Sequence, residues 1–279
     1  MKLSIIIPYS YKETFEILTK SIDTQIKYNR EDVEIIIIND TNEIIKYWDK
    51  VFKTPKPKSW PWIARNIWIE KASWDYIMFV DNDNIFTDVL VFNKVLNCIE
   101  NNKNENYIIF WNLAEDEYGL YPSYHYTQWT IFNRNFLLLN DIKFLPQFRA
   151  EDMYFDSLVR EHKWIDLKSP IIINRLHDKS IIALNKEKDK IAEIHFDCMC
   201  KIFERIQNKI YRDICFTIHF VALLKVCIEA DDYSIIDLDK IRSWEVKINN
   251  QKLLEFVETP AIQPIKDKIL NYILLNKLN

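Results

Sequence analysis

The chain has 279 residues, of which 48% are hydrophobic and 28% charged, and its formal net charge at neutral pH is −4. This length fits one domain of about 150–250 residues plus an appendage, and the composition is that of a soluble globular protein. The slightly acidic balance gives no reason to expect a nucleic-acid or anionic-membrane partner. Five cysteines without paired CxxC clusters argue against a disulfide framework or structural zinc site and favour a reducing cytosol.

We expect no helix that spans a bilayer. The apolar run at residues 3–7 is too short for a signal peptide and ends at Pro8. The most apolar later segment, residues 214–228, is interrupted by His219 and Lys225 and falls short of the roughly 20 residues that a span needs. We interpret it as a core helix, with peripheral docking on the inner face of a membrane as the alternative.

The first part of the chain predicts a βαβ unit. LSIIIP (residues 3–8) and VEIIIIND (33–40) are short Ile-rich runs, typical of strands buried on both faces of a parallel sheet. Between them, residues 12–27 carry apolar side chains at helical spacing, which predicts a crossover helix. A helix over residues 63–73 and a third strand over 76–80 follow.

Further elements are expected downstream, namely strands over residues 107–111, 130–133 and 171–174 and a helix over residues 151–162. Near residue 185 the composition changes to long Lys-, Glu- and Ile-rich segments with helical periodicity. We therefore predict an α/β domain over residues 1–185 and a helical region over residues 186–279.

Polar residues follow three of the expected strands, as Pro8-Tyr9-Ser10, Asn39-Asp40 and Asp81-Asn82-Asp83. In open α/β sheets, ligands bind beyond the carboxyl ends of the strands. A pair of carboxylates spaced Asp-x-Asp can hold a hard divalent cation, and such a cation can neutralise a departing diphosphate. A polar turn without a ligand is the alternative for residues 81–84, because Asp and Asn are the commonest turn residues.

Five motifs occur in order between residues 3 and 181: SIIIPYSYKE, EIIIINDTNE, ARNIWIEKASWDYIMFVDNDN, RAEDMYFDSLVRE and INRLHDKSI. Together they resemble the family 2 glycosyltransferases of GT-A fold, over about two-thirds of the chain. The resemblance implies an α/β fold with a GT-A (Rossmann-like), mostly parallel central sheet flanked by helices, followed by a helical C-terminal appendage. One departure is Asn39-Asp40-Thr41, where the family pattern has two acidic residues followed by glycine.

The resemblance also implies how the donor is bound. Asp40 would accept a hydrogen bond from the nucleobase, and Pro8 and Ser10 would line the nucleoside pocket. Arg65 would approach the nucleotide from the start of a helix, where a cation and a helix N-terminus both favour phosphate. A plain ion pair of Arg65 with Asp83, or exposure to solvent, is the alternative.

Metal ligands follow from the same motifs. Asp83 would bind a divalent metal, Mn²⁺ or Mg²⁺, while Asp81 or Asn82 touches the ribose or a metal-bound water; Asp81 is a second candidate ligand. His177 would complete the metal site or contact the diphosphate. A loop histidine that binds nothing is the alternative for His177.

Asp152 would be the general base that takes a proton from the acceptor hydroxyl, with Glu151 as the reserve candidate. Both are alternatively acidic residues favoured at a helix N-terminus by the helix dipole. The implied reaction is metal-dependent, inverting transfer of a hexose from a nucleoside diphosphate sugar, expected to be a UDP-sugar, to a carbohydrate or lipid-linked acceptor. Such a cytoplasmic enzyme would serve the biosynthesis of cell-surface polysaccharide. The alternative is a catalytically inactive GT-A-like domain that acts as a binding or scaffold subunit.

Glycine is almost absent from the chain. One glycine is present where average usage of about 7% gives roughly twenty, whereas tryptophan occurs nine times. Trp60, Trp62, Trp68 and Trp74 stand where the resemblance implies glycine, and Trp74 is expected at the left-handed position that stops a helix. We hypothesise that these are UGA codons read as glycine in the source organism. A Trp-rich variant that has lost activity is the alternative.

Overall fold

The protein is described by a computed structural model that covers residues 2–9, 12–29, 31–45, 50–55, 61–86, 89–103, 106–116, 119–123, 130–146, 151–162, 165–175, 188–259 and 262–278. The chain forms two compact units. The first comprises Met1–Phe148 with His162–Leu184, and the second comprises Arg149–Glu161 with Asn185–Asn279. The division at residue 185 drawn from the sequence stays a prediction.

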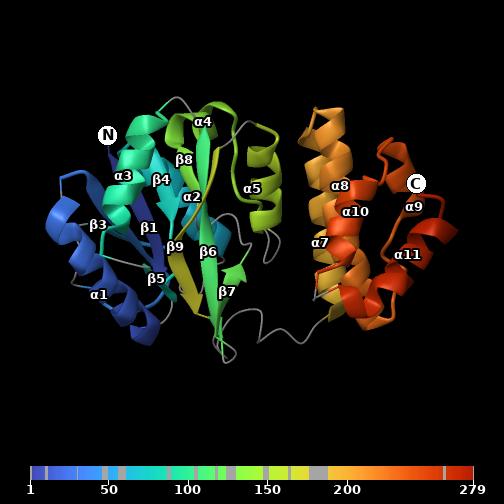
Figure 1. Ribbon diagram of the computed structural model, residues 1–279, viewed down its shortest axis with the longest axis horizontal. Helices are drawn as coiled ribbons and strands as arrows, with labels where there is room; N and C mark the ends of the chain where they lie inside the picture. Colours follow the sequence, from blue (N-terminus) through green and yellow to red (C-terminus); the bar gives the residue numbers. More distant parts are fainter. Residues whose placement is uncertain are drawn as a thin grey trace. The chain divides into compact units, whose positions relative to one another are not determined.

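A nine-stranded mixed sheet forms the centre of the first unit, with the order β3-β2-β1-β4-β8-β6-β9-β5 and with β7 paired to β6 (Figure 1). Its first four strands are mutually parallel, and β8 runs antiparallel to both β4 and β6. The strands are β1 (Leu3–Tyr9), β2 (Val33–Asn39), β3 (Lys50–Lys53), β4 (Tyr76–Phe79), β5 (Asn84–Phe86), β6 (Tyr107–Asp116), β7 (Gly119–Ser123), β8 (Thr130–Asn133) and β9 (Ile165–Arg175).

Helices cover both faces of this sheet (Figure 1). They are α1 (Lys12–Asn29), α2 (Pro61–Lys71), α3 (Val91–Asn101) and α4 (Arg134–Leu139). Because successive side chains of a strand point to opposite faces, Ile5 and Ile7 of β1 join a core cluster with α1 and α3. On the other face, Trp68 of α2 is fully buried and packs against Phe79 of β4, with ring centroids 5.9 Å apart.

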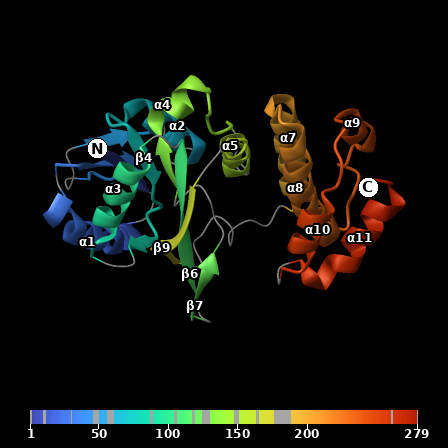
Figure 2. The same cartoon turned by 45° about the horizontal axis from the view of Figure 1, so that its top comes forward.

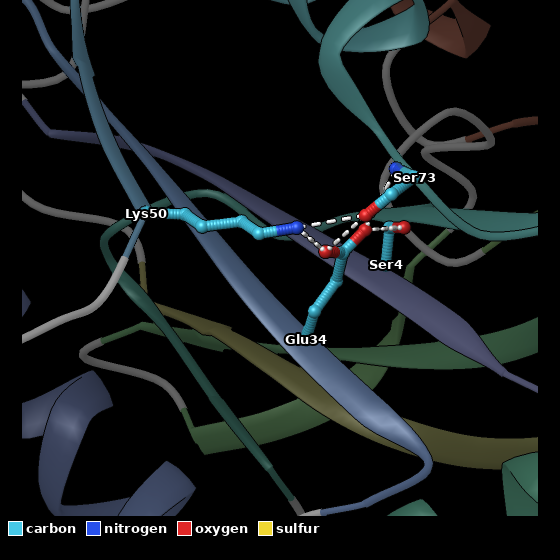
Figure 3. A network of polar contacts seen from close by, with 4 residues as sticks. All are labelled: Ser4, Glu34, Lys50 and Ser73. Carbon is cyan, nitrogen blue, oxygen red and sulfur yellow. Dashed lines mark hydrogen bonds and ion pairs between the residues drawn. The ribbon is translucent and has the colours of Figure 1, made fainter.

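A buried carboxylate ties α2 to the sheet (Figure 3). Glu34 of β2 accepts hydrogen bonds from the hydroxyl of Ser4, from the hydroxyl and backbone N–H of Ser73, and from the ammonium of Lys50. Burial alone would raise the pKa of Glu34, but these hydrogen bonds, that of Lys50 foremost, hold it below its usual value. The network therefore joins β1, β2 and β3 to the segment just after α2.

Trp74 does not occupy a left-handed position, so that expectation was wrong. Helix α2 ends at Lys71, and Trp74 lies three residues beyond it. Among the described residues other than glycine, positive φ angles occur at Asp141, Asp231, Glu245 and Lys277. Instead, the Trp74 ring carries the Lys2 ammonium 4.7 Å from its centroid.

The second unit is helical (Figure 2). It contains α5 (Glu151–Arg160), α7 (Lys188–Arg205), α8 (Lys209–Ala230), α9 (Leu238–Ser243), α10 (Asn250–Val257), the short 3₁₀ helix η2 (Gln263–Ile265) and α11 (Lys266–Leu275). Side chains at the N-caps begin three of them: Asn208 for α8, Asp237 for α9 and Asn249 for α10.

Helix α8 supplies the centre of the second core. Its buried residues pack with apolar side chains of α7, α10 and α11, so the prediction that residues 214–228 form a core helix is confirmed. Within the described part of the chain, α8 and the other helices all lack the length or the apolar character to cross a membrane.

Candidate functional site

The polar ends of the parallel strands meet at one edge of the sheet, as the sequence predicted. Tyr9 of β1 lies opposite Asn39 of β2, and the N–H of Asp40 donates to the Tyr9 carbonyl at 3.1 Å. On the other side of β2, the N–H of Thr54 donates to the Asn39 carbonyl at 3.2 Å. The N–H of Val80, directly before Asp81, continues the pairing of β4 with β1 at 2.9 Å.

Asp40 is fixed at this edge by Thr54, the residue that follows β3. The Thr54 hydroxyl donates to Asp40 Oδ1 at 2.7 Å, so the carboxylate of Asp40 is held in one orientation at the end of β2. Pro8 is half-buried in β1 and pairs in register with Ile38. Ser10, the other expected nucleoside contact, lies outside the described residues.

Asn39 organises the loop that follows β2. Its side-chain oxygen accepts from the N–H and hydroxyl of Thr41 at 2.9 and 2.8 Å, and its amide donates to the Glu43 carbonyl at 2.7 Å. The Tyr9 hydroxyl donates to the Glu43 carboxylate, and burial together with this contact raises the pKa of Tyr9. The departure from the family pattern at Asn39 thus shapes the loop beside Asp40.

The segment Asp81 to Asn84 is a hydrogen-bonded turn between β4 and β5. The N–H of Asn84 donates to the Asp81 carbonyl at 3.0 Å, while the Asn84 side-chain oxygen accepts from the Asp81 N–H at 3.0 Å. The amide of Asn84 also donates to Asp83 Oδ1 at 3.3 Å. Asn82, in the same turn, is buried. Asn84 therefore contacts both the backbone of Asp81 and the carboxylate of Asp83.

Electrostatics distinguishes this turn from an ordinary one. Burial, and then the charge of Asp81, raise the pKa of Asp83 to about 7. The guanidinium of Arg65, with only 8% of the residue exposed, lies 3.6 Å from Asp81 Oδ1. Each carboxylate makes ionisation of the other less favourable, and a cation bound between them would stabilise both negative charges. The two carboxylates therefore fit a hard divalent metal ion. Arg65 therefore forms an ion pair with Asp81.

A third metal ligand is not supplied by the described residues. Across those parts of the chain, no three His, Cys, Asp or Glu side chains gather into a group that could hold a metal. His177, the expected third ligand, lies outside the described residues.

The Arg65 guanidinium also makes a cation–π contact with Phe144. The guanidinium carbon lies 5.2 Å from the centre of the Phe144 ring. The side chain of Asn66 accepts from the Phe144 N–H and donates to the Phe144 carbonyl, both at 2.9 Å. Sequence reasoning missed this arrangement because the two residues that make it are 78 positions apart. It also missed Asn84 and Thr54, which orient Asp83 and Asp40.

The proposed base lies at the start of α5, in the second unit. Asp152 is exposed, and its Oδ1 accepts from the N–H of Met153 at 2.8 Å. Glu151 is only 7% exposed. Of the two acidic candidates, Asp152 is therefore the one whose carboxylate is open to a substrate.

The sequence profile of glycosyl transferase family 2 matches residues 4–156, which is more than half of the chain. The chain belongs to glycosyl transferase family 2. A segment of 93 residues is 34% identical to an uncharacterized glycosyltransferase of Rickettsia bellii (strain RML369-C), covering 30% of this chain and 13% of that relative. The chain thus corresponds to a small part of that relative's length.

Solved structures show the same fold. TarS 1–349 of S. aureus, in complex with UDP-GlcNAc, superposes with a TM-score of 0.68 at 14% identity, covering 100% of this chain and 88% of TarS 1–349. The mannosyltransferase PcManGT of Pyrobaculum calidifontis, in complex with GDP-Man and Mn²⁺, superposes with a TM-score of 0.56 at 10% identity. The superposition covers 99% of this chain and 86% of PcManGT. The expected GT-A fold class, with its helical C-terminal region, is confirmed.

The tryptophans of this family 2 chain lie partly in its core. Trp68 is fully buried and packs against Phe79 of β4. The indole N–H groups of Trp62 and Trp68 are nonetheless buried without a hydrogen-bond partner among the described residues. Trp60 lies outside the described residues.

Proposed function

We propose that the protein transfers a sugar from a nucleoside diphosphate sugar to a carbohydrate or lipid-linked acceptor. The observation that carries this proposal is that Asp40 and the Asp81–Asp83 turn follow parallel strands at the carboxyl edge of the sheet, where Arg65 pairs with Asp81. Ligands of open α/β sheets bind at this edge. Family membership supports the same reaction class.

The donor is assigned to the first unit. Asp40, held by Thr54, offers a carboxylate to an N–H of the nucleobase, and Pro8 and Ser10 line the nucleoside pocket. Arg65 supplies positive charge for the diphosphate. A UDP-sugar is the expected donor, and the UDP-GlcNAc complex of the structurally similar TarS supports this choice.

A divalent metal, Mn²⁺ or Mg²⁺, would be held by Asp83 and Asp81, with His177 as a third ligand. When bound, it would neutralise negative charge on the diphosphate leaving group. Burial, and then the charge of Asp81, raise the pKa of Asp83, which supports this assignment because a cation would stabilise both carboxylates. The Mn²⁺ complex of PcManGT supports it by analogy of fold.

Asp152 is the proposed general base. It accepts the proton of the acceptor hydroxyl while the hydroxyl oxygen bonds to the anomeric carbon. The bond from that carbon to the diphosphate oxygen breaks, and the electron pair leaves with the diphosphate. A single displacement inverts the anomeric configuration. The exposure of Asp152, compared with buried Glu151, supports this choice of base.

A screen of nucleotide sugars tests the proposal. Purified protein is incubated with UDP-GlcNAc, UDP-glucose, UDP-galactose or GDP-mannose, with and without Mn²⁺, and release of the nucleoside diphosphate is measured. Both the printed sequence and a version with glycine at positions 60, 62, 68 and 74 are assayed. We expect Mn²⁺-dependent release of UDP and its loss in Asp83→Ala. If neither version turns over any donor and Asp83→Ala leaves UDP binding unchanged, the inactive scaffold replaces the enzyme.

A further inference from the structure

Helix α5 belongs to the helical unit although it starts with the acidic pair of the family motif. It is grouped with residues 185–279 rather than with the sheet. More than half of its residues are buried: Glu151, Tyr154, Phe155, Ser157, Leu158 and Val159. The helix packs along α7. The C-terminal helices therefore form the support of the helix that carries Asp152.

Polar contacts fix both ends of α5. Near its start, Arg205 at the end of α7 donates from Nη1 to the Tyr154 hydroxyl at 3.1 Å. Just past its end, the Glu161 carboxylate accepts from the backbone N–H groups of Gln207 and Asn208, each at 2.7 Å. Those two residues connect α7 to α8, so α5 is held at the junction of two long helices.

A buried hydrogen bond fixes the middle of the helix. Ser157 Oγ lies 2.7 Å from His219 Nε2 of α8, and both residues are buried. Ser157 also donates its only hydroxyl proton to the Met153 carbonyl at 2.7 Å. With that proton directed at Met153, Ser157 Oγ can accept a hydrogen bond from Nε2–H of His219. Burial, and then the charges of His195 and Arg160, lower the pKa of His219 to about 3, which keeps it neutral.

We infer that helices α7 and α8, with the segment between them, hold the catalytic helix in place and that His219 is a positioning residue for Asp152, acting through Ser157. The inference rests on the proposed function. Ser157 follows Asp152 by five residues, about 7.5 Å along the same rigid helix. Because a misplacement of about 1 Å can cost about 100-fold in rate, loss of this bond is expected to reduce turnover without touching the donor site.

A double-mutant cycle tests the inference with the fastest donor from the four nucleotide sugars above. His219→Leu is expected to lower kcat about tenfold or more, with the Kd for UDP within twofold of wild type. Asp152→Asn is expected to lower kcat about 100-fold or more. In the Asp152→Asn background, His219→Leu is expected to have no further effect, because His219 acts only through Asp152. His219→Gln, whose amide can donate to Ser157, is expected to restore kcat to within about threefold.

Thr217→Val provides the matched control. Thr217 is buried on the same helix and accepts from the Asn249 N–H at 2.8 Å, on the side of α10. Loss of this hydrogen bond is expected to lower the free energy of unfolding about as much as His219→Leu does, while kcat stays within about twofold of the wild-type value. If Thr217→Val lowers kcat as much as His219→Leu does, or if His219→Leu lowers kcat equally in the Asp152→Asn background, the positioning role is wrong.

Amide hydrogen exchange separates this inference from the proposed function. His219→Leu is expected to increase exchange of the α5 amides about tenfold and to leave those of α2 unchanged. Unchanged exchange in α5 overturns the anchoring role whatever the activity. A different pair of results would overturn the proposed function alone. In that case His219→Leu speeds exchange in α5, which supports the anchoring contact, but the wild-type protein turns over none of the donors.

Discussion

Arg65 is positioned by a backbone clamp as well as by its charge partner. The side chain of Asn66 holds the backbone of Phe144 through two hydrogen bonds, and the Phe144 ring lies beneath the guanidinium. A cation–π contact of this kind is worth about 0.5–2 kcal/mol. The clamp therefore links the stability of residues 142–146 to the geometry of the proposed phosphate contact.

We expect Asn66→Ala to weaken UDP binding about tenfold, because Phe144 moves and Arg65 loses its support. Isothermal titration calorimetry with UDP measures this change. Asn140→Ala is the control, since the Asn140 amide donates to the backbone carbonyl of Phe136 at 2.8 Å, within the segment around α4. Equal UDP affinity in Asn66→Ala and wild type would show that the clamp has no part in donor binding.

Trp62 and Trp68 each bury an indole N–H that lacks a hydrogen-bond partner among the described residues. An unsatisfied buried donor costs about 1–3 kcal/mol, so two on adjacent turns of one helix are an unusual burden. We predict that both codons are UGA, read as glycine in the source organism. The gene sequence gives the first answer. UGG codons at these positions would contradict the prediction.

At the scale of elements, the Glu34 network joins three strands and the end of α2. Lys50→Met removes the cation and leaves the buried carboxylate with its serine donors. Removing one partner of a buried pair costs about 3–5 kcal/mol, and we expect about 2 kcal/mol here because the Lys50 side chain is 40% exposed. Urea unfolding at pH 7 measures the loss. Lys53→Met, at the exposed end of the same strand, is the control.

The pH dependence of this network follows from the lowered pKa of Glu34. A carboxylate whose pKa is lower in the folded than in the unfolded state stabilises the fold above its unfolded pKa, about 4.3. That stabilisation is lost as the pH falls through the lower, folded pKa. We expect the difference between wild type and Glu34→Gln to shrink as the pH is lowered from 5 to 3 in urea titrations. A constant difference over that range would exclude the linkage.

Elements with long Ile-rich runs or strong helical spacing were predictable from the sequence. Strands β1, β2, β4 and β8 and helices α1, α2 and α5 lie within about two residues of their expected positions. Strands β3 and β5 were missed because KVFK and NIF are too short for a period to show. Helix α3 was missed although its buried residues have helical spacing, so that signal was present in the chain.

The site residues that belong to a family motif were predictable from the sequence. The residues that support them from distant parts of the chain were not. Asp40 and Asp81 follow expected strands, and their placement at one sheet edge needed only the parallel order. The support of Arg65 by Phe144 depends on a tertiary contact that no local pattern encodes. The grouping of α5 with the C-terminal helices likewise depends on packing, which periodicity does not specify.

For the molecule as a whole, each unit contains a buried ionisable group, and the two groups reduce the stability of their units over different pH ranges. In the sheet unit, Glu34 becomes protonated below its usual pKa. In the helical unit, His219 lies beside Ser157 and Arg160 of α5 and His195 of α7, and burial, then the charges of His195 and Arg160, lower its pKa to about 3. Because the unfolded histidine titrates near pH 6.5, the unfolded helical unit binds a proton that the folded unit does not between those values.

We therefore expect the helical unit to lose stability first as the pH falls. Protonation of His219 in the unfolded state lowers the free energy of unfolding by about 1.36 kcal/mol for each pH unit below 6.5. At pH 5 this amounts to a loss of about 2 kcal/mol relative to pH 7. Hydrogen exchange followed by mass spectrometry at pH 7 and 5, corrected for the intrinsic rate, is expected to show weakened protection in α8 and α5 while β1 and β2 keep theirs. In His219→Gln the difference between the two pH values should largely disappear. If both units lose protection together at pH 5, or α8 keeps its full protection, His219 does not govern the acid sensitivity of this fold.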